Sequence, residues 1–115
     1  MLPSSRRISR KLFDSGLKTA SGFHASHFSL RAWRLQSPDL PSRFSVVVSS
    51  AVVRKAHDRN LLKRRARAVI EAALPGLKTG AAGAFFAKKG AGTLPFPELA
   101  TEIELLLKNA RLVIL

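Results

Sequence analysis

At the centre of the chain stands the run Arg54-Lys55-Ala56-His57-Asp58-Arg59-Asn60-Leu61-Leu62-Lys63-Arg64-Arg65-Ala66-Arg67, which leads directly into an apolar segment ending at Leu74. From Lys55 to Leu74, apolar residues recur at spacings of three and four, which predicts a helix with one buried stripe. The members of this stripe are Leu62, Ala66, Val69, Ile70 and Ala73. Pro75-Gly76 is expected to end the helix.

The polar side of this helix is strongly basic. The run holds seven Lys or Arg residues in 14 positions and a single acid. Arg59, Lys63 and Arg67 follow one another by four residues, so a rigid rod presents cations about 6 Å apart, near the phosphate spacing of folded RNA. Asn60 and Arg64 lie beside them. A merely solvated face would mix Glu with Lys, so this pattern favours contact with nucleic acid.

Length, net charge and Cys content limit the classes of protein to which the chain can belong. At 115 residues the chain is expected to form one domain, residues 1–115. Its 20 basic and 7 acidic residues give a net charge of +13, which is usually tolerated because a polyanion neutralises it. Nucleic acid is therefore the expected partner, and an anionic membrane surface is the competing one. No apolar run is long enough to span a bilayer, and the absence of Cys fits a reducing cytoplasm.

The N-terminal part adds a second group of cations. Residues 5–15 form a candidate short helix that ends at Gly16. The auxiliary basic residues there are Arg6, Arg7, Arg10 and Lys11, and Lys18 follows. Together with the central run they hold 12 of the 20 basic residues, so the charge is localised. A mitochondrial transit peptide has a similar composition and is the less favoured interpretation.

Two strands are expected between this segment and the central helix. His24 to Leu35 alternates, which predicts a strand with one buried face. Its buried face would hold Phe28, Leu30 and Ala32, and its polar face His27, Ser29, Arg31 and Trp33. Residues 44–49 form a second, buried strand, and the turn cluster 37–42 would join the two as a hairpin.

Aromatic residues near these strands admit two interpretations. On the polar face, Arg31 and Trp33 are suited to stack on unpaired bases, unless that face is simply exposed to solvent. Phe13 is either part of the core or a further stacking platform. In the first interpretation, the polar strand face would form the floor of a groove for unpaired bases.

The C-terminal part supplies a short strand, 84–87, and a helix, 95–115. Leu99, Ile103, Leu106 and Ala110 would form the apolar stripe of this second helix. The order helix, strand, strand, helix, strand, helix predicts an α+β fold of two layers, in which helices pack on a sheet.

No catalytic group is expected. The three His residues have no metal-ligand spacing, Cys is absent, and the acids are too scattered for a two-metal nuclease site. Neither Gly-rich turn, 80–83 or 90–92, matches a phosphate-binding loop. The chain is therefore predicted to bind no metal, cofactor or small-molecule substrate by itself, and not to cut RNA alone.

Ser49 to Arg67 resembles the signature of the protein subunit of bacterial ribonuclease P. Val48-Ser49 matches the end of the family's buried strand, Lys55-Ala56 the lead-in, and Arg59-Asn60 the core of its Arg-Asn-Arg motif. Further matches, over most of the chain, are Leu2-Pro3, Phe13, Gly16, Phe28-Ser29-Leu30-Arg31, Gly83 to Lys89, Phe96 and Glu98-Leu99.

Three places depart from the family pattern. Leu61 stands at the third motif position, where the family has Arg. Ser50 and Ala51 replace two lysines, and Ser9 replaces a Phe one helical turn before Phe13. These changes affect the transfer of individual RNA contacts and leave the expected fold unchanged.

The resemblance implies an α/β two-layer sandwich, with a small mixed sheet and a left-handed crossover. It also implies that the protein is part of a cytoplasmic ribonucleoprotein that removes the 5′ leader of precursor tRNA. In the family, the ribonuclease P RNA performs the Mg²⁺-dependent hydrolysis, and the protein binds that RNA and the leader. Carried over, the contact with the catalytic RNA comprises Lys55, Arg59, Asn60, Lys63, Arg64 and Arg67. The leader cleft comprises Phe13, Ser29, Arg31 and Trp33. The alternative is a ribosomal or other structural RNA-binding protein without a role in cleavage.

Overall fold

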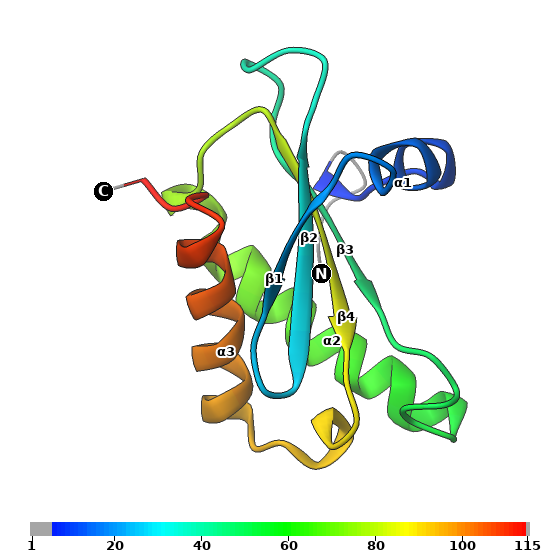
Figure 1. Cartoon of the computed structure of the whole chain (residues 1–115). Helices are drawn as coiled ribbons and strands as arrows, with labels where there is room; N and C mark the ends of the chain where they lie inside the picture. Colours follow the sequence, from blue (N-terminus) through cyan, green and yellow to red (C-terminus); the bar gives the residue numbers. More distant parts are fainter. Residues whose placement is uncertain (1–5, 115) are drawn as a thin grey trace.

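The computed structural model describes residues 6–114, so Leu2-Pro3 and Ser5 lie outside the described part. Its elements are, in order, α1 (Arg10–Gly16), β1 (Ser21–His24), β2 (Phe28–Arg34), β3 (Arg43–Val47), α2 (Ala56–Ala73), β4 (Ala81–Ala87) and α3 (Phe96–Asn109) (Figure 1). Two 3-10 turns, η2 (Leu74–Gly76) and η3 (Ala91–Thr93), follow α2 and β4. The predicted α+β order is confirmed, with β1 as an additional strand.

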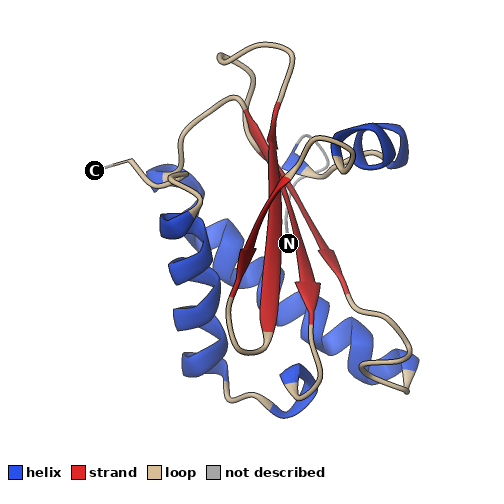
Figure 2. Cartoon of the chain, in the orientation of Figure 1, coloured by secondary structure: helices blue, strands red, loops and turns tan. Residues whose placement is uncertain are grey.

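The strands form one mixed sheet in the order β1-β2-β4-β3 (Figure 2). β2 pairs antiparallel with β1 and with β4, whereas β3 and β4 are parallel neighbours. α2 connects these two parallel strands. In Figure 1 both strands point downward, β4 lies to the left of β3, and α2 passes behind the sheet. This arrangement is a left-handed crossover, the rare hand for such a connection, as the family resemblance implied.

The pairing of the strands differs from the sequence prediction in one respect. The expected hairpin between β2 and β3 is wrong, because β4 lies between them. The hairpin in the structure joins β1 and β2, since the chain turns at residues 25–27. β4 also begins at Ala81 rather than at Ala84. A Cβ on Gly83 would lie 3.0 Å from Leu30 Cδ1, so a small residue is needed at this buried position.

The main core lies between one face of the sheet and the helices α2 and α3. Its strand residues come from alternate positions of β2, β3 and β4, namely Phe28, Leu30, Phe44, Val46, Ala81 and Phe85. From α2 come Leu62, Ala66, Val69 and Ile70, and from α3 come Leu99, Ile103, Leu106 and Leu107. The buried stripes predicted for α2 and α3 are therefore confirmed, except that Ala73 and Ala110 are only partly buried.

α3 ends earlier than the sequence suggested. It ends at Asn109 because Arg111 takes a left-handed conformation with φ 60°, and the Leu112 N–H then donates to the Leu107 carbonyl. Val113 forms an isolated bridge with Leu77, which returns the chain to the end of η2.

The opposite face of the sheet is covered in part by α1, which adds a partial third layer to the expected two. α1 rests on Trp33, which is 8% exposed, and on the small residues Ala82 and Ala84. The backbone of Gly16 lies directly against the indole, since a Cβ there would be 2.0 Å from Trp33 Cε2. Because α1 is short, part of this face stays uncovered.

Candidate nucleic-acid interface

The uncovered part of this sheet face, here called the open sheet face, carries mixed side chains from all four strands. Its members are His24, Ser29, Arg31, Ser45, Val47 and Phe86. Ser29 stands opposite both His24 and Phe86 in the sheet register, and Phe86 stands opposite Val47. Arg31 and His24 are exposed, while the others are half-buried. This surface therefore combines a cation, hydroxyl groups and an aromatic ring.

α1 forms one wall of the open sheet face. Its first turn is capped by Ser9, whose hydroxyl accepts from the Leu12 N–H at 3.3 Å. Phe13 is half-buried, and the centroid of its ring lies 6.1 Å from that of Phe86. Three predicted leader-cleft residues, Phe13, Ser29 and Arg31, thus lie around one surface. Phe86 joins them, although the Ala-rich sequence of β4 gave no signal for it.

Trp33 does not belong to this surface in the expected way. Its side chain points to the same face as Ser29 and Arg31, as the alternation predicted, but it lies beneath α1. The predicted stacking of Trp33 on bases is therefore wrong, because the ring is the packing surface for Gly16. Its Nε1 is buried without a hydrogen-bond partner among the described residues.

His27 also differs from its predicted position. It lies in the turn between β1 and β2, not on the polar face of the strand. Its backbone N–H donates to Glu102 Oε1 at 2.8 Å, and its Nδ1 lies 2.5 Å from Glu102 Oε2. These two bonds attach the hairpin turn to α3, so His27 has a structural role.

The basic residues of α2 form an arc along one side of its buried stripe. Lys63 and Arg67 are half-buried, and Asn60 and Arg64 are exposed. Lys55 precedes the helix as its exposed N-cap residue. The geometry agrees with the arc that the sequence spacing predicted.

Arg59 makes contacts that the sequence did not predict. Its Nη1 donates to the Val53 carbonyl at 3.0 Å and to the Arg54 carbonyl at 2.6 Å. The guanidinium therefore holds the turn between β3 and α2 in place. Its remaining N–H groups stay available for a phosphate, so Arg59 both shapes this end of the arc and adds charge to it.

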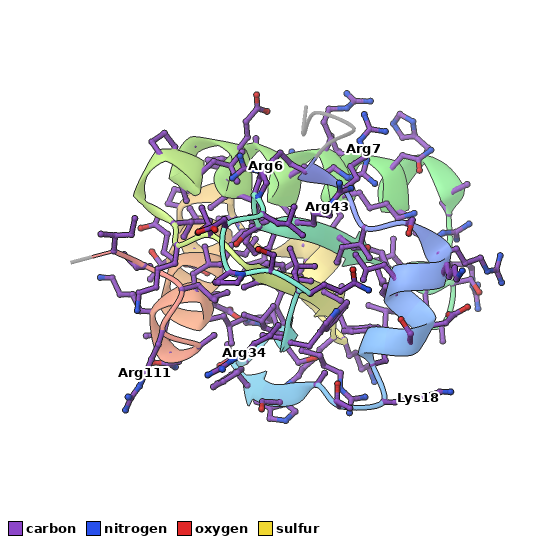
Figure 3. All side chains as sticks on the ribbon, turned by 90° about the horizontal axis from the view of Figure 1, so that it is seen from above. Arg6, Arg7, Lys18, Arg34, Arg43 and Arg111 are labelled. Atoms are coloured by element: carbon purple, nitrogen blue, oxygen red, sulfur yellow. The ribbon has the colours of Figure 1, made fainter. Side chains whose placement is uncertain are left out.

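The N-terminal cations lie at the β3 edge of the sheet. Arg7 bridges Phe44 in parallel fashion, Arg6 Nε donates to the Ser42 carbonyl at 2.9 Å, and Arg43 Nη1 donates to the Arg7 carbonyl at 3.1 Å. Figure 3 shows the side chains of Arg6, Arg7 and Arg43 gathered on one side of the molecule. Arg43 is an addition to the predicted set, while the predicted Arg10 and Lys11 are exposed on α1.

Other kinds of site to consider in the described residues are a small-molecule pocket, a metal site and a membrane span. A cavity of about 500 Å³ lies between α2 and α3, and its lining is mostly apolar, with Glu104 and Lys108 as its charged members. Among residues 6–114, no three His, Asp or Glu side chains lie close enough together to hold a metal ion. No helix in the same range has the length and apolar character needed to cross a membrane.

Comparison with known proteins decides the family. The family model for ribonuclease P matches residues 2–111. The chain belongs to the ribonuclease P protein family. It is 34% identical over 115 residues to the ribonuclease P protein component of Microcystis aeruginosa, covering 97% of this chain and 96% of that one. The surfaces described above are therefore surfaces of a ribonuclease P protein.

Solved ribonuclease P proteins share the fold. The Staphylococcus aureus protein superposes with a TM-score of 0.81 at 17% identity, covering 96% of this chain and 99% of that chain. The Thermotoga maritima protein gives a TM-score of 0.79 at 21% identity, with coverages of 90% and 96%. At such low identity the likeness concerns the fold alone, including the four-stranded sheet between α1 and the other two helices.

Proposed function

We propose that this protein is the protein component of a bacterial ribonuclease P and acts in the cytoplasm on the 5′ end of precursor tRNA. It binds the catalytic RNA through the arc of α2 and the single-stranded 5′ leader on the open sheet face. The observation that carries the proposal is the family match from residue 2 to residue 111. The two surfaces support it because they differ in kind: one is a row of cations on a helix, and the other is a sheet surface with mixed polar and aromatic side chains.

The arc of α2 is suited to the backbone of a folded RNA. Its cations stand on a rigid helix, so the backbone that carries them loses little conformational freedom when phosphates bind, and each neutralised phosphate releases counterions. Asn60, between the cations, offers both a donor and an acceptor to a base edge or a ribose hydroxyl. Arg59 fixes the turn at the start of the helix through its bonds to Val53 and Arg54.

The open sheet face is suited to bind single-stranded RNA. Phe86 and Phe13 provide aromatic surface for an unstacked base, Ser29 can bond to a base edge, and Arg31 can neutralise a phosphate. α1 closes one side of the open sheet face, so the single-stranded RNA would follow the exposed part of the sheet. A structural RNA-binding protein would need no such surface for a single strand.

The hydrolytic step is assigned to the RNA. Mg²⁺ supplies the activated water and the stabilisation of the leaving oxygen in phosphodiester hydrolysis. The described residues offer no cluster of carboxylates for such an ion. The protein instead brings cations to the RNA, which lowers the repulsion between leader and catalytic RNA.

The leader contact is tested with Arg31→Ala. We expect the variant, bound to the catalytic RNA, to lose about two- to fivefold in affinity for precursor tRNA with a leader, because one exposed ion pair is removed. Affinity for mature tRNA should not change, since it has no leader.

The matched control is Arg34→Ala, which removes an exposed Arg at the end of β2 from the other face of the strand. Fluorescence titrations of both RNAs give the comparison. Equal losses for precursor and mature tRNA, or equal losses in the two variants, would argue against binding of the leader on the open sheet face.

A further inference from the structure

A second, smaller hollow lies beside the start of α2. It has a volume of about 280 Å³ and lies between the turn before α2, the first turns of α2, and η3. Its lining consists of Val52, Val53, Asp58, Leu61, Leu62, Arg65, Gly90, Gly92 and Thr93. On the helix, Leu61 and Arg65 lie on the flank opposite Lys63 and Arg67, so the hollow adjoins the arc without being part of it.

The inner surface of the hollow is apolar and shaped by close packing. Val53 and Leu62 are buried, and Val52 and Leu61 are half-buried. The η3 turn approaches closely, because a Cβ on Gly92 would lie 3.1 Å from Val53 Cγ2. The volume equals that of roughly nine water molecules, at about 30 Å³ each, which leaves room for a flat ring against the apolar wall.

Two charged residues of opposite sign stand at its rim. Asp58 and Arg65 are both exposed, and neither forms an ion pair with another described residue. Asp58 suits the first turn of α2 through the helix dipole, but a carboxylate repels phosphate and is unexpected beside an arc that binds RNA. A carboxylate, an apolar wall and a guanidinium around one hollow are complementary to a ring with N–H donors that carries a phosphate.

We propose that this hollow takes one unpaired nucleotide of the bound RNA and prefers guanine. The base would lie against Val52 and Leu61, Asp58 would accept from N1–H and the 2-amino group of guanine, and Arg65 would bind the phosphate. Guanine is preferred because it presents two adjacent donors to one carboxylate, whereas uracil presents a single N–H. The proposal rests on the proposed function, since α2 must face RNA.

This assignment also accounts for Leu61. The family pattern has Arg at this position, and here Leu61 forms part of the apolar wall. Arg65 stands one helical turn further on the same flank and supplies a cation there. The local charge is thus retained, while the apolar side chain of Leu61 gives the base a contact surface.

The test is a titration of the ¹⁵N-labelled full chain with GMP and, separately, with UMP. GMP should shift the backbone amides of Leu61, Gly92 and Thr93 and bind about tenfold more tightly there than UMP. Asp58→Asn should abolish this preference, while Arg65→Ala should weaken both nucleotides. The control Asp39→Asn makes the same charge change in the distant 37–42 loop and should leave the preference intact.

The same spectra show whether each variant is folded. Shifts confined to Lys63 and Arg67, or equal binding of GMP and UMP, would overturn the proposal, because both indicate phosphate binding without recognition of a base. Either result would leave the proposed function standing if the wild-type protein still supports cleavage of precursor tRNA by a ribonuclease P RNA. If the wild-type protein does not support cleavage, the proposed function itself is contradicted.

Discussion

Gly16→Ala is expected to lower the free energy of unfolding by about 2–3 kcal/mol, as overpacking of a well-packed contact does. A Cβ on Gly16 would lie 2.0 Å from Trp33 Cε2, so it would overlap the buried indole and one of the two must shift. α1 must therefore shift away from the sheet or lose its last turn. Urea denaturation measures the change as a lower midpoint with a similar slope.

The control for this variant is Gly76→Ala, because a Cβ there meets no heavy atom within 4 Å and Gly76 has no positive φ. This second variant should be close to neutral. Since α1 is a wall of the open sheet face, Gly16→Ala should also weaken binding of the leader. Equal stability of the two variants would show that α1 does not rest on Trp33 as described.

The double variant Lys63→Ala with Arg67→Ala is expected to reduce the salt dependence of binding to the catalytic RNA. The slope of log K against log salt should fall by about 1.4 to 1.8, the loss of two phosphate contacts. The affinity at low salt should fall steeply as well, because counterion release is the main source of this binding. Filter binding at several salt concentrations measures both quantities.

The matched control is Lys78→Ala with Lys108→Ala, which removes two exposed lysines near the far ends of α2 and α3. For this control variant, the slope of log K against log salt should stay close to that of the wild type. A slope that is unchanged in the first variant, or reduced equally in both, would mean that binding depends on total charge and not on the arc. Arg59 is left intact, because its removal would also release the carbonyls of Val53 and Arg54.

The parts of the fold that were predictable are those with a strong local period. The stripe of α2, from Leu62 to Ile70, recurs over more than two turns and admits no strand interpretation. The same holds for Leu99, Ile103 and Leu106 in α3. The crossover hand came only through the resemblance, because periodicity carries no information on the order of strands in a sheet.

The parts that were missed depend on tertiary contacts. The Ala-rich start of β4 has low strand propensity, but its small residues allow the strand to lie in the middle of the sheet between Leu30 and Phe44. The position of β4 also separates β2 from β3, which no local pattern indicated. The early end of α3 depends on the backbone of Arg111, a position where the sequence has no glycine to signal it.

In the candidate site, too, local patterns predicted some residues correctly, and tertiary contacts decided the others. Spacing on a helix placed Lys63 and Arg67 correctly, and alternation placed Ser29 and Arg31 on one face. Alternation gave the correct face for Trp33 too, yet burial under α1 removes it from the surface. Phe86 and Arg43 join the interface through pairing across the sheet and through the N-terminal segment, neither of which was visible in the linear sequence.

The measurement that tests the central claim most directly is cleavage of precursor tRNA by a bacterial ribonuclease P RNA at low Mg²⁺, with and without this protein. We expect the added protein to restore cleavage at the mature 5′ end, and the protein alone to cut nothing. A protein that binds the RNA tightly but restores no cleavage, with a cognate RNA as well as a heterologous one, would contradict the proposed function and favour a structural RNA-binding role.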